Sequence, residues 1–427
     1  MVKAKGPRPQ SRFDIRPEEW LSAAEAAALL EVKRATLYTY VSRGLVRCVP
    51  ERGTKENRYL RADLERLKAR HDARAGHTAV AAGALRWGEP VIDSAVSQVG
   101  AEGLAYRGHS AVRLAVEGRS LEYVAELLWT GTPPAEPVRW PSPEPLLPAA
   151  QVAALLPPEA PPLTILLAMV PLLSARDPTR FDAPAEQERR RGQRLLRYLA
   201  AWVGAAREPA RVARALETET VADSLAAAWG ITAKRAPELL NRALVLCADH
   251  ELNVSTFAAR VTASSGADLY ACVGAALAAL SGPRHGGACD RIEALVREVG
   301  GPERARQGVH ERLRRGESVP GFGHPLYPDG DPRTPPLLEV AYALRPEPVA
   351  VRVLRTVEET MREAGHPAAT VDFGLVALAS ALRLPEGAAT ALFAVGRAAG
   401  WVAHVLEQRE QGHVLRPRAR YVGGTSE

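Results

Sequence analysis

The stretch APELLNRALVLCADHEL, residues 236–252, carries apolar side chains at spacings of three and four residues. That spacing is the period of an amphipathic helix. It recurs in QRLLRYLAAWVGA (193–205), VADSLAAAWG (221–230) and LYACVGAALAALSG (269–282). Alanine is abundant and aromatic residues make up only 5% of the chain, which favours packed helices over a β-sandwich. The sequence therefore predicts an all-α fold.

The length of 427 residues and the hydrophobic content of 46% predict two or three packed domains and exclude disorder of the whole chain. The N-terminus MVKAKGPRPQSRFD is charged and no apolar run follows it, so we expect no secretory signal and a cytoplasmic protein. Two apolar stretches, 163–173 (broken by Pro171) and 269–280, are shorter than the roughly 20 residues of a membrane span, so no membrane partner is expected.

The four cysteines show no CxxC spacing and sit in apolar or mixed surroundings. This pattern is typical of buried thiols in a reducing compartment. We therefore expect neither a disulfide nor a metal site.

Positive charge is concentrated near the N-terminus. Residues 1–74 hold 17 Lys and Arg against 10 Asp and Glu, which leaves 38 against 39 in the rest of the chain. Such asymmetry is typical of a segment that binds a polyanion, although a solvated basic face would look the same.

The same segment has the pattern of a helix-turn-helix. In LSAAEAAALLEVKRATLYTYVSRGLV (21–46), Ser22 and Glu25 form a capping box for a first helix, and a second is expected from Arg34 to Arg43, ended by Gly44. Strand-like VRCVP and NRYLR and the helix ADLERLKAR follow. The segment resembles the winged helix-turn-helix domains of MerR-type regulators and excisionases. The side chains available to DNA are Arg34, Thr36, Tyr38, Thr39 and Arg43. Helix pairs of this kind also serve as protein interaction modules.

Between this segment and the helical region, residues 72–82 are small and polar and predict a linker. GEPVIDSAVSQVG (88–100) alternates in polarity and predicts a short strand pair. The proline-dense run 132–162 predicts surface turns and short helices inside one domain.

Three polar islands interrupt the helical pattern: ADHELNVSTF with His250 and Asn253, SGPRHGGA with His285, and GFGHPLYPDGDPR with His324 and Arg333. A lone histidine is most often a hydrogen-bonded structural residue. Glycines on both sides change that expectation, because they let a ligand approach the ring closely.

Two further charges lie in apolar surroundings. Asp372 in AATVDFGLVALASAL is expected as an N-cap or first-turn carboxylate. Arg397 in AVGRAAGWVAHVLEQ is expected to need a buried anion. The tail LRPRARYVGG adds Arg416 near the C-terminus.

Taken in order, the motifs DHELN, GPRHGGA, GFGH with DPR after it, VDF, GRAAGWVAH and RPRARYVG resemble those of citrate synthases over about residues 85–423. The resemblance implies a helical fold of two parts: a large one (75–283 and 384–427) and a small one (284–383), after the helix-turn-helix domain of residues 1–74. It implies condensation of acetyl-CoA with oxaloacetate, with no other cofactor.

The resemblance also implies roles for individual residues. Asp372 matches the base that deprotonates the thioester methyl, and His285 matches the neutral donor that stabilises the enol. His324 matches the group that polarises the ketone of oxaloacetate. The residues implied to contact oxaloacetate are His250, Asn253, Arg333, Arg397 and Arg416, the last from the partner subunit of a homodimer.

Two alternatives stay open. One methylene separates acetyl-CoA from propionyl-CoA, so a 2-methylcitrate synthase has the same motifs. The basic N-terminal segment also fits a DNA-binding regulator that uses the synthase fold to sense a metabolite.

Overall fold

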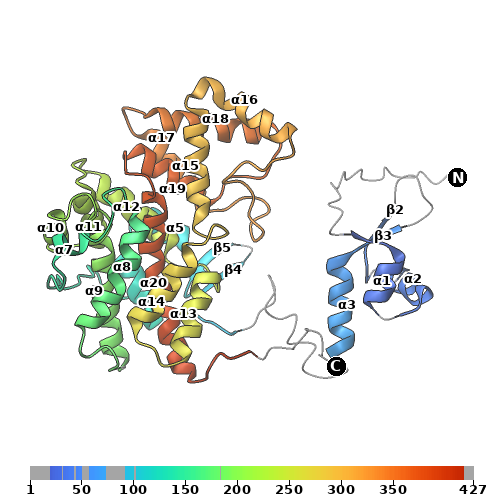
Figure 1. Cartoon of the computed structure of the whole chain (residues 1–427), viewed down its shortest axis with the longest axis horizontal. Coiled ribbons are helices and arrows are strands. Elements are labelled where there is room, and N and C mark those ends of the chain that lie inside the picture. Colours follow the sequence, from blue (N-terminus) through green and yellow to red (C-terminus); the bar gives the residue numbers. More distant parts are fainter. Residues whose placement is uncertain are drawn as a thin grey trace. The chain divides into compact units, whose positions relative to one another are not determined.

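The computed structural model describes residues 20–30, 32–42, 45–50, 57–73, 92–100, 102–182 and 184–417. The chain divides into two compact units, residues 1–93 and 94–427. Figure 1 draws both units along the chain.

The first unit is a helix-turn-helix with a small sheet. Its elements are β1 (Trp20–Leu21), α1 (Ala23–Leu29), α2 (Arg34–Ser42), β2 (Cys48–Pro50), β3 (Asn57–Leu60) and α3 (Arg61–Ala73). The sheet order is β1-β3-β2 and both pairings are antiparallel, with Cys48 opposite Tyr59. The predicted capping box is confirmed, since Glu25 N donates to Ser22 Oγ (3.3 Å) and Ser22 N donates to Glu25 Oε2 (2.8 Å).

The core of this unit fixes which face of α2 is free. Leu37 is fully buried together with Ala26 and Leu64. Because one face of α2 is used in this way, its other side chains project outward. Arg43, Gly44 and most of the expected linker lie outside the described residues.

The second unit is mainly helical. A three-stranded antiparallel sheet precedes the helices: β4 (Ser97–Gly100), β5 (Gly103–Tyr106) and β6 (His109–Ser110). The predicted strand pair within 88–100 is therefore wrong in its partner, since β4 pairs with β5, which follows it. The tight turn at Gly103, with φ of 89°, allows this hairpin.

The helices of the second unit are α5 (Ala111–Val116), α6 (Leu121–Thr130), α7 (Ala149–Ala153), α8 (Pro162–Arg176), α9 (Ala185–Trp202), α10 (Arg211–Leu216), α11 (Val221–Trp229), α12 (Ala236–Cys247), α13 (Val254–Ser264), α14 (Leu269–Leu280), α15 (Gly287–Val299), α16 (Pro302–Arg314), α17 (Thr334–Ala343), α18 (Val349–Glu363), α19 (Val371–Ala381) and α20 (Ala388–Gln411). Helix α8 contains Pro171 in its interior and packs on α14.

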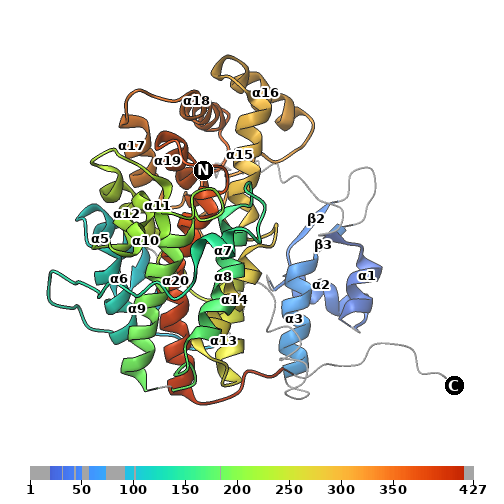
Figure 2. The same ribbon diagram turned by 60° about the vertical axis from the view of Figure 1, so that its left-hand side comes forward.

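Helix α20 is the centre of the unit, and other helices flank it in both ribbon views (Figures 1 and 2). By length and composition it could cross a membrane, but 94% of its apolar window is buried inside the protein. Its glycines allow close packing: a Cβ on Gly396 would lie 2.7 Å from Leu244 O, and one on Gly400 would lie 2.5 Å from Ala248 O. Both contacts are with α12 and the residue after it, so α20 lies directly against the start of the DHELN segment.

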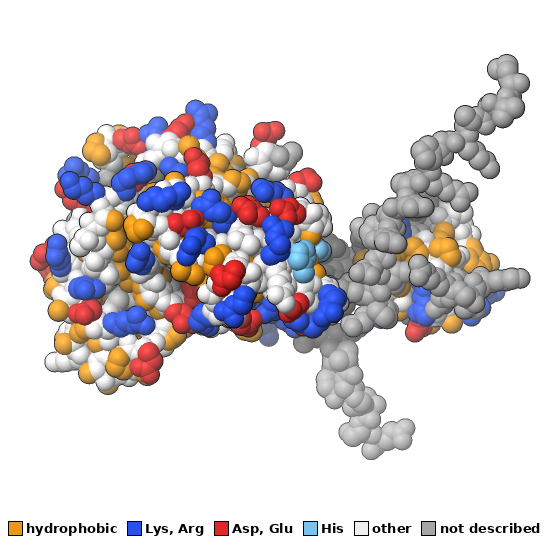
Figure 3. Space-filling view, turned by 90° about the horizontal axis from the view of Figure 1, so that it is seen from above, with side chains coloured by type: hydrophobic (Ala, Val, Ile, Leu, Met, Phe, Trp, Pro, Cys, Tyr) orange, Lys and Arg blue, Asp and Glu red, His pale blue; other side chains and the backbone are white. Residues whose placement is uncertain are grey.

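Helices α15–α19 gather at one end of the unit (Figure 1). Seen from that end, the surface mixes Lys and Arg with Asp and Glu (Figure 3), without a field of one sign. The proposed division into a large part (75–283 and 384–427) and a small part (284–383) stays a prediction.

Candidate active site

The loop after α12 presents His250. Its side chain is buried, and Nε2 lies 2.9 Å from the hydroxyl of Tyr327. Burial, and then the charges of Arg333 and Arg397, hold the pKa of His250 well below its usual value. The ring is therefore neutral at physiological pH. Its neighbour Glu251 has a positive φ of 51°, a strained conformation for a residue with a side chain.

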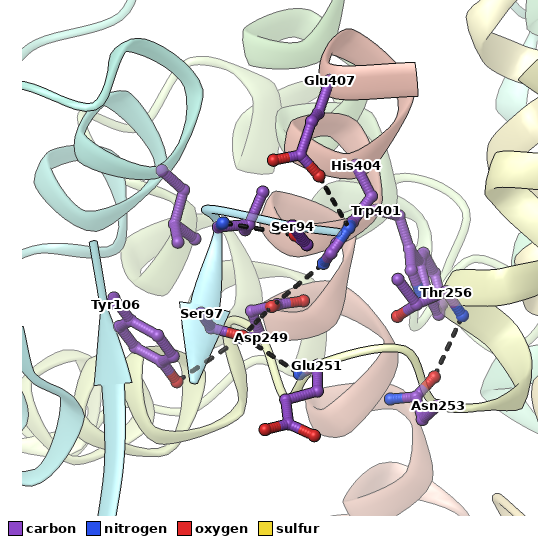
Figure 4. A network of polar contacts seen from close by, with 12 residues as sticks. Ser94, Ser97, Tyr106, Asp249, Glu251, Asn253, Thr256, Trp401, His404 and Glu407 are labelled. Atoms are coloured by element: carbon purple, nitrogen blue, oxygen red, sulfur yellow. Dashed lines mark hydrogen bonds and ion pairs between the residues drawn. The ribbon is translucent and has the colours of Figure 1, made fainter. Parts of the chain in front are cut away.

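A polar network holds this loop in place (Figure 4). Asp249 Oδ2 accepts hydrogen bonds from Ser97 Oγ and from His404 Nε2 (3.2 Å), and Ser97 Oγ accepts one from Glu251 N (3.0 Å). Tyr106 OH accepts one from Asp249 N (3.4 Å). The network ties β4, β5 and α20 to the loop, so it determines where His250 points.

Sequence reasoning missed Asp249, Ser97 and His404. Burial alone would raise the pKa of Asp249, but His404, Arg397 and Ser97 outweigh burial and keep it below its usual value. A signal existed, because a carboxylate at the end of an apolar helix needs partners. The partners themselves lie about 150 residues away along the chain.

His285 lies at the junction between α14 and α15, as predicted. Its Nε2 is 2.9 Å from Ser255 Oγ, which also accepts a hydrogen bond from Trp401 Nε1 (3.2 Å). Burial and the charge of Arg397 lower the pKa of His285 to about 4. A side chain on Gly286 would collide with Leu280 O, which explains the glycine after the histidine.

The loop 321–333 carries His324. Gly321, Gly323 and Gly330 all have positive φ. Gly323 N donates to Ala368 O (3.1 Å) and Thr370 N donates to Gly321 O (2.9 Å), so the loop is tied to the segment before α19. The rings of His324 and His250 are 5.6 Å apart and nearly perpendicular. The loop thus brings the first and third histidine motifs together.

The His324 ring is oriented by its own loop, because Nδ1 accepts a hydrogen bond from Leu326 N (3.2 Å). Its neutral ring therefore carries the proton on Nε2. Burial and the charge of Arg333 lower the pKa of His324. The ring can donate one hydrogen bond to a ligand from Nε2.

Arg333 is buried but already paired. Its Nε donates to Asp331 Oδ1 (2.9 Å) and its Nη2 to Asp331 Oδ2 (2.7 Å). Burial opposes the charge of Arg333, but Asp331 outweighs burial and raises the pKa of the guanidinium. One edge of the guanidinium is therefore held by Asp331, and the predicted contact of Arg333 with oxaloacetate stays a prediction. Asp331 and Arg333 are the first and third residues of the motif DPR, so the sequence already places the two charges close together.

Arg397 is fully buried and lacks such a partner. Its Nε donates to Cys247 O (2.8 Å), and its guanidinium lies 4.5 Å from the centre of the Phe393 ring. Within the described part of the chain, Nη1 has no hydrogen-bond partner. Burial lowers the pKa of Arg397, and the charge of Asp249 opposes this. The expected buried anion is thus only partly supplied by the protein.

Asp372 is the second residue of α19. Of the two expected positions, the first turn is confirmed, since Thr370 is the N-cap and Asp372 lies in the first turn. Asp372 Oδ1 is 3.6 Å from Cys289 Sγ, and Oδ2 is 3.4 Å from Thr370 Oγ1. Burial raises the pKa of this carboxyl, and Arg333 opposes the rise. A carboxylate with a raised pKa is a stronger base.

Two predicted substrate contacts have other surroundings. Asn253 caps α13, where its Oδ1 accepts from Thr256 N (2.9 Å) and Ser255 Oγ (2.8 Å). Arg416 is exposed, five residues beyond the end of α20. Neither is brought into contact with the histidines by an interaction within the described residues.

On the helix-turn-helix, Arg34, Tyr38 and Thr39 are exposed on α2, and Thr36 is half-buried.

All four cysteines are free thiols. The described residues contain no cluster of three or more His, Cys, Asp and Glu suited to a metal ion.

This mainly helical unit encloses neutral histidines, buried arginines and a carboxyl of raised pKa. Such a set of groups is typical of a site for acid–base chemistry on a small anion. The family model described as "Citrate synthase, C-terminal domain" matches residues 84–418. The chain belongs to the citrate synthase family. A second model, "Helix-turn-helix domain", matches residues 20–72.

Relatives and a solved structure agree with this. The chain is 38% identical over 189 residues to "Citrate synthase 2" of Bacillus subtilis, a match that covers 44% of this chain and 51% of that protein. It is 35% identical over 217 residues to "2-methylcitrate synthase" of Shewanella oneidensis, covering 49% and 58%. The matches thus span about half the length of these relatives. The crystal structure of citrate synthase from Thermotoga maritima superimposes with a TM-score of 0.66 at 26% identity, covering 80% of this chain and 95% of that one.

Proposed function

We propose that this protein condenses acetyl-CoA with oxaloacetate and water to give citrate and coenzyme A. Its family membership supports the reaction class. The observation that carries the proposal is the buried guanidinium of Arg397, whose Nη1 has no hydrogen-bond partner among the residues that the structure describes. Its charge also acts on both His250 and His285. An unpaired buried cation is costly unless a ligand anion completes it.

The first half of the reaction needs a base and a hydrogen-bond donor. Asp372, with its raised pKa, removes a proton from the thioester methyl. His285 donates a hydrogen bond from Nδ1 to the thioester oxygen as the enol forms, which requires the single proton of Ser255 Oγ to turn from Asn253 Oδ1 to His285 Nε2. Its pKa of about 4 keeps the ring neutral for this role. The proton ends on Asp372 and the electron pair in the enol.

In the second half of the reaction, the site must bind both carboxylates of oxaloacetate and polarise its ketone. Arg397 and the remaining edge of Arg333 bind the carboxylates of oxaloacetate, with His250 beside them. His324 donates from Nε2 to the ketone oxygen and protonates the developing alkoxide. Water then hydrolyses the citryl thioester. These steps are acid–base chemistry, so the proposal includes no metal or organic cofactor, and the cytoplasmic location stays a prediction.

The experiment that tests the proposal measures release of free coenzyme A thiol when purified protein receives oxaloacetate with acetyl-CoA or with propionyl-CoA. Faster release from acetyl-CoA supports a citrate synthase. Preference for propionyl-CoA supports the second candidate, a 2-methylcitrate synthase, which the Shewanella oneidensis relative favours. No release from either thioester by folded protein contradicts both.

We also propose a homodimer in which Arg416 completes the partner's site. The outer sides of α13 and α14 offer an apolar surface, where Val254 is 62% exposed and Ala271 and Ala278 are exposed. Such a face is suited to a second copy of the chain. Arg416 itself is exposed and makes no contact with its own histidines among the interactions of the described residues.

Mixing two inactive variants tests this arrangement. Asp372→Ala and Arg416→Ala, co-refolded in equal amounts, are expected to regain about one quarter of wild-type turnover, because half of the dimers are mixed and one of their two sites is intact. Each variant alone serves as the control. Activity that stays at the level of the separate variants would place Arg416 in its own subunit's site or outside both.

The helix-turn-helix supports DNA binding as an additional function. Arg34, Tyr38 and Thr39 lie exposed on α2, the helix that such domains place in the major groove. Arg34→Ala is expected to weaken binding to a promoter fragment from the protein's own operon several-fold and to reduce the salt dependence of binding. Arg113→Ala, which removes an exposed arginine of the second unit, is the control. Equal affinity of all three proteins would count against a DNA role for α2.

A further inference from the structure

One buried thiol lies against the proposed base. Cys289 is the third residue of α15, and His285 lies in the turn just before this helix. Its Sγ is 3.6 Å from Oδ1 of Asp372, and its side chain is 1% exposed. Helix α15 packs against α19, which carries Asp372. The contact therefore joins α19, which carries the proposed base, to the helix that begins just after the proposed donor.

In this contact the thiol is the hydrogen-bond donor and the carboxylate is the acceptor. Burial, and then the negative charge of Asp372, raise the pKa of the Cys289 thiol well above its usual value. The thiol stays protonated and is a donor to the carboxylate. A hydrogen bond to the charged form of a carboxyl lowers its pKa, whereas burial raises it. Cys289 thus opposes the effect of burial on Asp372.

The contact also fixes the plane of the carboxylate. Oδ1 is turned toward α15 by the thiol, whereas Oδ2 is 3.4 Å from Thr370 Oγ1, at the long end of hydrogen-bond distances. Oδ1 accepts a hydrogen bond from the thiol, which is a weaker donor than a hydroxyl. Oδ2 has only the long contact with the Thr370 hydroxyl. That arrangement leaves Oδ2 as the oxygen able to accept a proton.

We propose that Cys289 is a positioning residue for Asp372: its thiol holds Oδ1 and thereby orients Oδ2 toward the substrate. The inference rests on the proposed role of Asp372 as the base. It assigns to the thiol neither a covalent step nor a redox step.

The test compares Cys289→Ala and Cys289→Ser with the wild-type protein in the coenzyme A release assay across pH. The alanine variant loses a donor, so the acidic limb of kcat is expected to move to higher pH. The serine variant offers a stronger donor, so the limb is expected to move to lower pH. With alanine, kcat at the optimum is expected to fall about 3- to 10-fold, because the carboxylate loses one hydrogen bond.

The control is Cys272→Ser, which replaces a buried thiol on α14 whose Sγ contacts Ala267 O instead of Asp372. It is expected to keep the wild-type pH profile. A thiol that only fills space would give lower melting temperatures in all three variants with the acidic limb unmoved. Coincident limbs, or shifts of the same sign for alanine and serine, would overturn the proposal.

A second readout does not depend on turnover. The infrared S–H stretch of Cys289, isolated by subtracting the spectrum of Cys289→Ser, is expected to move to higher frequency in Asp372→Asn, because the ionised acceptor is lost. An unmoved band would overturn the proposed contact. If the wild-type protein releases no coenzyme A from either thioester, the proposed function fails, and this band still decides whether the thiol holds the carboxylate.

Discussion

Asp372→Ala is expected to lower the turnover of acetyl-CoA with oxaloacetate by on the order of 10³-fold or more, since general base catalysis contributes about 10² to 10⁴ and no neighbouring carboxylate can replace this one. Asp331, the nearest alternative, is occupied by Arg333. The measurement is thiol release together with the melting temperature. A variant that retains near wild-type turnover would rule out Asp372 as the base.

The fold of Asp372→Ala is expected to survive. The pKa of this carboxyl is raised, so the folded protein binds its proton more readily than the unfolded chain does. Its contribution to stability is therefore full at low pH and is lost as pH rises through the folded pKa. At neutral pH, removal of the carboxyl relieves an unfavourable buried charge. Glu339→Ala, which removes an exposed carboxylate on α17, is the control and should retain full turnover.

Arg397→Met is expected to reduce kcat/KM for oxaloacetate by about 10²- to 10³-fold, in line with the loss of a charged, buried hydrogen-bonding partner for a carboxylate. Its effect on stability is expected to be small, within about 1 kcal/mol. The guanidinium has a lowered pKa and an unpaired Nη1, so the folded protein already disfavours the charge. Steady-state kinetics with oxaloacetate as the varied substrate and thermal unfolding measure the two effects.

A second buried arginine supplies the matched control. Arg191 is 1% exposed, as Arg397 is, but its Nε pairs with Asp177 (2.9 Å) and its Nη1 with Glu188. Arg191→Met removes one of the two arginines that pair with each carboxylate and leaves only Arg194 near Asp177 and Arg409 near Glu188. It is expected to destabilise the protein by up to about 3 to 5 kcal/mol, with little change in the KM of folded enzyme. If Arg397→Met is as destabilising as Arg191→Met, or binds oxaloacetate normally, Arg397 is a structural residue.

Much of the fold could be predicted from the sequence. The period of apolar residues places α14 at Leu269–Leu280, and the Ser22–Glu25 pair marks the start of α1. The order of six short motifs indicates the citrate synthase family, which the family model over residues 84–418 confirms. The strand pair is an exception, because β4 pairs with β5, which lies outside the predicted stretch 88–100.

Which side chains engage each other at the site could not be predicted in the same way. Arg333 engages Asp331, Asn253 caps α13, and Cys289 lies against Asp372. Motif spacing alone indicates neither the occupied edge of Arg333 nor the free Nη1 of Arg397. Both depend on which neighbours the packed helices supply.

The sequence by itself therefore determined the helical class, the helix-turn-helix and the set of chemical groups, because helix period, caps and glycine turns depend on residues within a few positions of one another. Only the tertiary structure decided the protonation and orientation of those groups. Ser97, Asp249 and His404 meet across separations of about 150 residues, and α20 brings Arg397 beside them. Burial and charge at such contacts set each pKa, and they exist only once the helices are packed.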